Sequence, residues 1–153
     1  MMQSKSPDGN HPIYTVGYEG RTPDDVLSLL NSNNIEILLD VRIRPQSRKP
    51  GFSKRRLSEL CEHSRISYKH MKELGTPREM MDRIKAGNGY DSDIFDEYKR
   101  YMLTQEESLE SLALIATQNL TCLLCYELDA NVCHRIIIAK EISKRLGGPI
   151  KNL

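Results

Sequence analysis

The sequence lacks long hydrophobic runs and any hydrophobic signal at its start. No apolar stretch approaches the roughly 18–20 residues that a membrane-spanning helix needs. The first residues, 1–11, are polar and contain no signal-peptide core. We therefore expect no membrane partner, and the missing export signal favours a cytoplasmic location.

Excess charge of one sign is also lacking, and cysteine is scarce. With 22 basic and 21 acidic residues the formal net charge is +1, so any affinity for phosphate must come from a local patch. The four cysteines are Cys61, Cys122, Cys125 and Cys133. A chain of 153 residues can bury an adequate core without disulfides, and we expect free thiols.

The composition that remains is that of a globular protein. Hydrophobic residues make up 39% and charged residues 28% of the chain, and 153 residues fit one domain. Residues 1–12 are rich in Ser, Pro, Asp, Gly and Asn, which predicts a disordered tail. Residues 13–153 are expected to form a single compact domain without internal repeats.

Predicted strands and helices alternate along this domain. Strands are predicted over residues 13–16, 35–41, 66–70 and 120–126, with an edge strand over 149–153. Helices are predicted over residues 22–33, 53–64, 76–87, 92–102, 106–118 and 132–146. We expect an α/β fold with a mostly parallel sheet of about four or five strands flanked by helices, with a helical insert before the penultimate strand.

Two predicted helix starts carry capping patterns. Thr22, followed by a proline and two acids, is expected to cap the first helix. Thr76 and Glu79 have the spacing of a capping box, in which Glu79 reaches back to the amide of Thr76.

The carboxyl ends of parallel strands meet at one edge of a sheet, and ligands bind there. Three segments leave predicted strands in that sense: Gly17 to Gly20, Asp40 to Arg44, and Glu127 to Arg135. Asp40 and Arg42 alternate with Val41, so their side chains should point to the same face. We expect the three segments to share one pocket.

The segment from Cys125 to Arg135 is the strongest candidate for chemistry. We place Cys133, His134 and Arg135 in the first turn of the last helix, where free amides and the helix dipole favour an anion. The same field would lower the pKa of Cys133 and make it a nucleophile, whereas a small buried cysteine is the alternative. A cation at a helix start opposes the dipole unless an anion compensates, so Arg135 favours an anionic ligand.

Several separated motifs resemble the family called domain of unknown function 488 (DUF488). The residues that carry the resemblance are Tyr14 to Gly20, Asp40-Val41-Arg42, Pro45, Ser47, Phe52, Leu74-Gly75, Leu124 to Glu127, and Cys133-His134-Arg135. It extends from Ile13 to the end of the chain. The resemblance implies a compact α/β domain with an Asp-Val-Arg and a Cys-His-Arg segment, and no established substrate. At Tyr18-Glu19, relatives often carry His-Ser.

These motifs give candidate roles to particular side chains. The catalytic candidates are Cys133, His134, Glu127 and Asp40. The substrate-binding candidates are Arg42, Arg135, Arg44 and Tyr18. In this hypothesis Arg42 and Arg135 clamp a phosphate or carboxylate, Cys133 or a water attacks, and His134 or a carboxylate moves the proton. A structural ion pair between strand and helix is the alternative for the arginines.

A basic loop follows the second predicted strand and contains no acid between Arg42 and Ser58. Its seven cations are Arg42, Arg44, Arg48, Lys49, Lys54, Arg55 and Arg56. With Phe52 available for stacking, the loop is a candidate nucleic-acid or nucleotide contact, although solvated charge is the simpler interpretation. Two functions remain open: an enzyme for an anionic small molecule or nucleic acid, and a non-catalytic nucleic-acid-binding module that uses residues 42–56.

A zinc site must also be weighed, because Cys122, Cys125, Cys133 and His134 have a zinc-like spacing. Zinc pairs at this spacing normally lie on a tight turn. Cys122 and Cys125 instead fall in a predicted strand, where positions three apart point to opposite faces. We therefore predict no metal and no cofactor, and we interpret Cys122 as a core residue.

Overall fold

The computed structural model describes residues 11–87 and 89–153. In these residues the elements follow the order β1 (Ile13–Gly17), α1 (Pro23–Ser32), β2 (Ile37–Asp40), α2 (Lys54–His63), β3 (Ser67–His70), η1 (Lys72–Leu74), α3 (Arg78–Ala86), α4 (Ser92–Leu103), α5 (Glu106–Gln118), β4 (Thr121–Cys125), η2 (Ala130–Val132), α6 (Arg135–Leu146) and β5 (Ile150–Asn152). Here η1 and η2 are single 3-10 turns.

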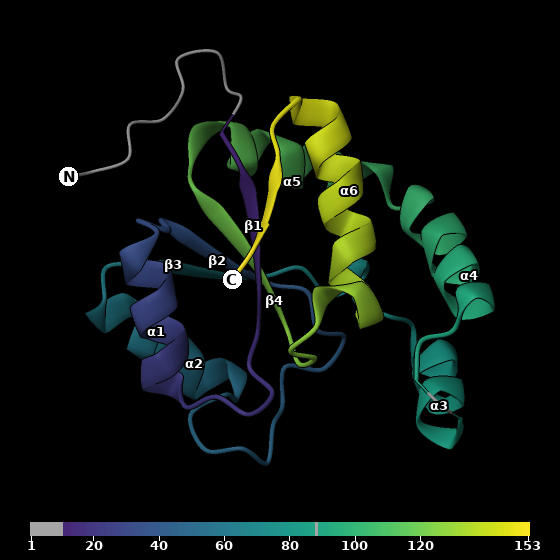
Figure 1. Cartoon of the computed structure of the whole chain (residues 1–153), viewed down its shortest axis with the longest axis horizontal. Coiled ribbons are helices and arrows are strands. Elements are labelled where there is room, and N and C mark those ends of the chain that lie inside the picture. Colours follow the sequence, from purple (N-terminus) through teal and green to yellow (C-terminus); the bar gives the residue numbers. More distant parts are fainter. Residues whose placement is uncertain (1–10, 88) are drawn as a thin grey trace.

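The five strands form one sheet in the order β3-β2-β4-β1-β5, and every neighbouring pair is parallel. Helices α1 and α2 lie on one side of the sheet, and α5 and α6 lie on the other (Figure 1). The helices α3, α4 and α5 precede β4, the penultimate strand. The predicted fold class is confirmed, including the helical insert.

Each face of the sheet has its own hydrophobic core. Leu38, Cys122 and Leu124 pack with α1 and α2, whereas Leu39 and Cys125 pack with α5 and α6. Because both faces are covered, the central strands are predominantly apolar, as the sequence indicated. Cys122 and Cys125 lie on opposite faces, and Cys122 is a core residue as predicted.

The first predicted helix cap is confirmed. The Thr22 hydroxyl accepts a hydrogen bond from the Asp25 amide at 3.1 Å, and the Thr22 amide donates to the Asp25 carboxylate at 2.8 Å. The prediction for Thr76 is wrong. Helix α3 begins at Arg78, and the Thr76 hydroxyl bonds the Tyr90 hydroxyl at 3.0 Å instead of an amide of the helix.

The predicted start of the last helix is also wrong. Asp129 accepts a hydrogen bond from the Asn131 amide at 2.9 Å, which stabilises the 3-10 turn η2. Cys133 then adopts an extended conformation, with φ −133° and ψ 143°, and α6 begins at Arg135. Cys133 therefore does not lie in a helical turn, and the helix dipole does not explain its chemistry.

The predicted tail covers residues 1–12, of which 1–10 lie outside the described residues. His11 is buried, and its Nε2 contacts the carbonyl oxygen of Ala116. All four cysteines are free thiols, as predicted. Among the described residues, no helix is both long and apolar enough to cross a membrane.

Candidate functional site

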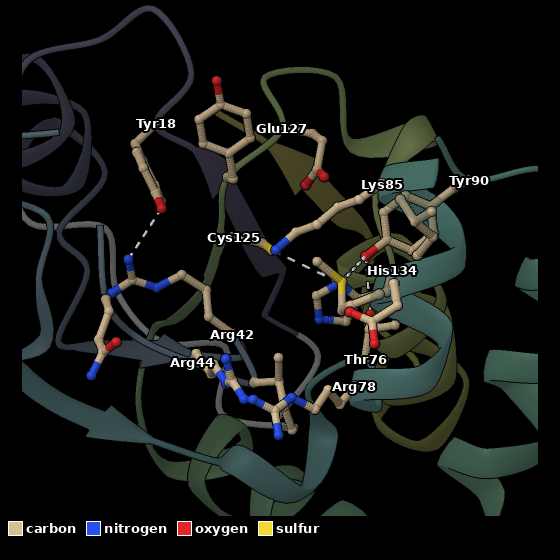
Figure 2. Close-up of a pocket in the computed structure, with 16 residues that line it drawn as sticks. Tyr18, Arg42, Arg44, Thr76, Arg78, Lys85, Tyr90, Cys125, Glu127 and His134 are labelled. Atoms are coloured by element: carbon tan, nitrogen blue, oxygen red, sulfur yellow. Dashed lines mark hydrogen bonds between the residues drawn. The ribbon is translucent and has the colours of Figure 1, made fainter. Parts of the chain in front are cut away.

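A cavity of about 550 Å³ lies at the carboxyl edge of the sheet (Figure 2). Its wall contains Tyr18 after β1, Arg42 after β2, and Cys125 at the end of β4. Strands β2 and β4 are neighbours that lead to helices on opposite faces, which is where ligand crevices open in parallel sheets. The three segments predicted to share one pocket all contribute to this cavity.

On one side of the cavity, Asp40 and Arg42 form a buried ion pair. Arg42 Nε and Nη2 donate to the two carboxylate oxygens at 2.9 and 2.7 Å. Arg42 Nη1 donates to the Tyr18 hydroxyl at 3.1 Å and to the Phe52 carbonyl at 2.7 Å, and Asp40 also accepts from the Tyr68 hydroxyl. Burial disfavours the Arg42 charge, but the Asp40 carboxylate outweighs it and raises the pKa of Arg42. The Asp40–Arg42 pair is therefore a structural tie: it links the segments around it, and Arg42 has few N–H groups left to bind a ligand.

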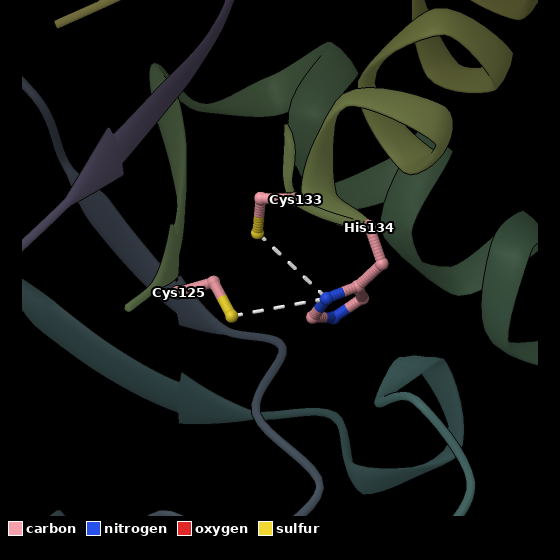
Figure 3. Close-up of side chains that lie close together, drawn as sticks. All are labelled: Cys125, Cys133 and His134. Atoms are coloured by element: carbon pink, nitrogen blue, oxygen red, sulfur yellow. Dashed lines mark hydrogen bonds between the residues drawn. The ribbon is translucent and has the colours of Figure 1, made fainter. Parts of the chain in front are cut away.

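On the other side, Cys125, Cys133 and His134 form a buried cluster (Figure 3). The His134 Nδ1 lies 3.8 Å from each of the two sulfur atoms. His134 Nε2 lies 2.8 Å from the Val41 carbonyl oxygen, which only accepts, so Nε2 carries a hydrogen. In the neutral imidazole, Nδ1 therefore presents its lone pair to the two thiols.

The side chains of this cluster and the neighbouring Glu127 shift one another's pKa values. Burial alone would raise the pKa of Cys133, but a hydrogen bond from Cys125 and the charge of His134 outweigh it and hold that pKa well below its usual range. The same hydrogen bond, together with burial, raises the pKa of Cys125. Burial lowers the pKa of His134, but the Cys133 thiolate reverses this and raises it. Burial and the same thiolate raise the pKa of Glu127 to about 7.

Glu127 lines the cavity two residues after the end of β4 (Figure 2). Its Oε2 is buried and has no hydrogen-bond partner among the described residues. The backbone of Glu127 passes very close to Gly17 at the end of β1. A Cβ atom on Gly17 would lie only 1.8 Å from the Glu127 carbonyl oxygen, so only glycine fits there without a shift of the backbone. Gly17 therefore serves a close approach of two chain segments, a role that the sequence pattern did not reveal.

Arg135 holds the loop after β4 in place by hydrogen bonds to its backbone. The side chain is fully buried, and Nη1 and Nη2 donate to the carbonyls of Glu127 and Leu128 at 2.5 and 3.2 Å. Arg42 lines the cavity whereas Arg135 does not, so the two guanidiniums do not face a common ligand there. Cys133 is likewise fully buried and outside the cavity wall, behind Cys125 and His134.

Three exposed cations, Arg44, Arg78 and Lys85, line the cavity together with the acid Asp82. No ion pair joins these three cations to any acid among the described residues. A second hollow of about 650 Å³ adjoins the first, sharing Arg44 and Arg78 with it. Among residues 11–87 and 89–153, its wall is formed by Ile43, Arg44, Pro45, Gln46, Lys54, His70, Lys72 and Arg78, and none of these is an acid.

The cations of the predicted basic loop have different interaction partners. Arg42 is tied to Asp40, and Lys49 Nζ donates to the Tyr18 carbonyl at 3.1 Å. Arg55 and Arg56 pair with Glu59 at 3.4 and 3.2 Å. Of the seven cations, Arg42, Arg44 and Lys54 line the two hollows. Arg44 and Lys54 form no ion pair with an acid in the part of the chain that the structure describes. The loop is therefore not a uniform basic surface.

Sequence reasoning missed the contribution of the helical insert. Thr76, Arg78, Lys85 and Tyr90 all line the cavity, although they lie far in sequence from the strand-end motifs. The zinc-like set in the sequence contains Cys125, Cys133 and His134, but the sequence argued against it because Cys122 and Cys125 face opposite sides of their strand. The structure brings the other three together without Cys122. A Tyr90 hydroxyl that lies 3.3 Å from His134 Nδ1 completes this side of the cavity.

The comparisons with known proteins give one match. The family model described as "Domain of unknown function DUF488" matches residues 22–142. No curated protein and no solved structure matches the chain.

Proposed function

Since the chain belongs to the DUF488 family, whose description assigns no activity, we propose a function from the site: the protein is an enzyme that hydrolyses a phosphate-bearing substrate. The substrate would be held in the cavity beyond β2 and β4. The two sources of phosphate to be distinguished are a free nucleotide and a single-stranded nucleic acid.

The observation that carries the proposal is the acid-free hollow beside the cavity. Arg44 and Arg78 lie in the walls of both spaces, and Lys54 and Lys72 extend the positive wall away from Cys125 and Glu127. Cations without acidic partners attract phosphate far more effectively than cations already engaged in ion pairs. An anion at Arg44 and Arg78 would lie between the second hollow and the reactive side chains.

The reactive side of the cavity supports attack by water rather than by Cys133. Cys125, His134 and Glu127 all line the wall, whereas Cys133 lies behind them, out of reach of a substrate. In the proposed reaction the water oxygen adds to phosphorus and the bond from phosphorus to the leaving oxygen breaks. Glu127 accepts the proton of the attacking water, and a solvent water at the open side of the cavity donates the proton that the leaving oxygen takes up.

The predicted residues outside the reactive side have positioning roles in this proposal. Arg135 fixes the backbone of Glu127, and Asp40 orients Arg42, which in turn holds the Tyr18 hydroxyl. Tyr18 and Tyr126 meet edge to face with ring centroids 5.3 Å apart, and Tyr126 is 46% exposed. An exposed ring at the mouth of a cationic cavity suits stacking with a nucleobase.

The proposal is tested by binding a short fluorescein-labelled single-stranded oligonucleotide, with AMP and inorganic phosphate as competitors. The double variant Arg44→Ala/Arg78→Ala should weaken binding at least about tenfold and reduce the steepness of the log-log salt dependence by about 1.4, because each contact to a single strand contributes about 0.7. The matched control, Arg55→Ala/Arg56→Ala, removes the same charge from α2 and should change affinity less than about twofold. Equal losses in the two double variants would overturn the proposed site.

The acid-free hollow also favours a second candidate, a nucleic-acid-binding module without catalysis. In that case Glu127→Gln would leave oligonucleotide affinity unchanged, and the wild-type protein would cleave neither the oligonucleotide nor bis-p-nitrophenyl phosphate. The enzyme proposal expects turnover of a phosphate ester by the wild type and its loss in Glu127→Gln. Stronger competition by AMP than by an equal concentration of oligonucleotide phosphate would identify the free nucleotide as the substrate class.

A further inference from the structure

We propose that Cys125, Cys133 and His134 bind a zinc ion whose fourth coordination position opens into the cavity. The sequence predicted no metal, because Cys122 and Cys125 point to opposite faces of their strand. The described residues instead bring Cys125 together with Cys133 and His134, while Cys122 faces the opposite core.

The separations within the cluster match the edges of a coordination tetrahedron. Zinc binds sulfur at about 2.3 Å and nitrogen at about 2.0–2.1 Å, so tetrahedral angles place the two ligand atoms about 3.6 Å apart. The measured distances from His134 Nδ1 to the sulfurs of Cys125 and Cys133 are both 3.8 Å. All three ligand atoms lie within 4.8 Å of one another, so small side-chain shifts would complete the site.

The surroundings of His134 are those of a metal ligand. The Nε2 hydrogen is donated to the Val41 carbonyl at 2.8 Å, which fixes the ring and directs the Nδ1 lone pair toward the two sulfurs. A backbone carbonyl that holds the second nitrogen is one of the common outer partners of a zinc-bound histidine, with carboxylates and water. A divalent cation between the two sulfurs and Nδ1 would replace the protons that these groups otherwise share.

The donor set favours zinc over harder divalent cations. Two thiolates and one imidazole suit zinc, whereas magnesium and calcium take oxygen ligands. The three side chains are at most 6% exposed, so water competes weakly for the ion on the buried side. They come from the end of β4 and from the residues directly before α6, two segments held in place by the sheet and its core.

The position of the cluster leaves one coordination site open. Cys125 and His134 line the cavity and Cys133 lies behind them, so a bound ion would face the cavity across its fourth position. Three protein ligands and one water are typical of catalytic zinc, whereas structural zinc has four protein ligands. Metal binding does not depend on the proposed hydrolysis, but its use to activate the attacking water rests on the proposed function.

The test starts from protein treated with EDTA under reducing conditions and titrated with zinc against a chromophoric chelator. The wild type should bind one equivalent. Cys125→Ser, Cys133→Ser and His134→Ala should each weaken the affinity at least about 100-fold. The control Cys61→Ser removes a buried thiol of the other core and should bind as the wild type does. Arg44→Ala/Arg78→Ala should also bind zinc normally, so a failed anion site would not be mistaken for a failed metal site.

A measurement on the wild type avoids variants that fold poorly. Cobalt should produce a thiolate-to-cobalt charge-transfer band and an intense tetrahedral visible spectrum, and zinc should protect two of the four cysteines from a thiol reagent. A Cys125–Cys133 disulfide that forms equally with and without zinc, a cobalt spectrum without thiolate bands, or four equally reactive thiols would overturn the proposal.

Discussion

The two sides of the cavity differ in how far their buried polar groups are satisfied by hydrogen bonds and ion pairs. On one side, the Asp40 carboxylate and the Arg42 guanidinium are paired and bonded to tyrosines and to backbone. On the other side, Glu127 Oε2 has no partner among the described residues. His134 is held through Nε2 by the Val41 carbonyl, whereas its Nδ1 lies 3.3 Å from the Tyr90 hydroxyl and 3.8 Å from each sulfur. Polar groups whose hydrogen bonds are all satisfied, such as Asp40 and Arg42, stabilise the structure. A polar atom without a partner, such as Glu127 Oε2, is available to bind a ligand.

Removing the carboxylate of Asp40 should have the largest effect on stability. Asp40→Ala leaves the buried Arg42 guanidinium without its counter-ion, and we expect a loss of about 3–5 kcal/mol in the free energy of unfolding. Urea denaturation measures the loss, with Glu59→Gln as the exposed ion-pair control. A loss below about 1 kcal/mol would show that the pair is not the structural tie proposed here.

Adding a methyl group at Gly17 should have the next largest effect. In Gly17→Ala the new Cβ meets the Glu127 backbone, so the loop after β4 must move, and we expect a loss of about 3 kcal/mol in unfolding free energy. Gly20→Ala is the matched control, since its Cβ meets nothing within 4 Å although φ is +73°. That control should lose about 1 kcal/mol. Similar thermal and urea stabilities of the two variants would contradict the close approach.

Neutralising Glu127 should have little effect on stability and a specific effect on activity. Glu127→Gln removes a partly buried charge whose Oε2 has no partner, so we expect the free energy of unfolding to change by less than about 1 kcal/mol. Turnover of a phosphate ester should fall about 100-fold, equivalent to about 2.7 kcal/mol in the barrier. Urea denaturation and steady-state kinetics on one preparation separate the two effects. If Glu127→Gln instead lowered the free energy of unfolding and kept its turnover, Glu127 would be a structural residue and the proposed difference between the two sides would be contradicted.

The fold was largely predictable, because strand and helix patterns depend on local apolar spacing. The continuous apolar runs at β2 and β4 indicated strands covered on both faces, and both cores confirm this. The meeting of the strand-end segments followed from parallel topology alone. Element ends were less predictable, since Thr76 found Tyr90 as a partner and Asp129 stabilised a turn before α6.

The individual roles at the site were harder to predict. Arg42 and Arg135 look alike in sequence, and only the tertiary structure shows that Arg135 bonds the carbonyls of its own loop. The contribution of Arg78 and Lys85 depends on where the helical insert packs, which no local pattern specifies. The pairing of Cys125 with Cys133 depends on the extended backbone between η2 and α6.

The most direct test of the anion site is a crystal structure of the protein after diffusion of tungstate, a phosphate analogue that anomalous scattering locates without ambiguity. We predict one tungstate between Arg44 and Arg78, where the cavity meets the acid-free hollow. Tungstate bound only at Arg55 and Arg56, or absent from both hollows at saturating concentration, would contradict the account.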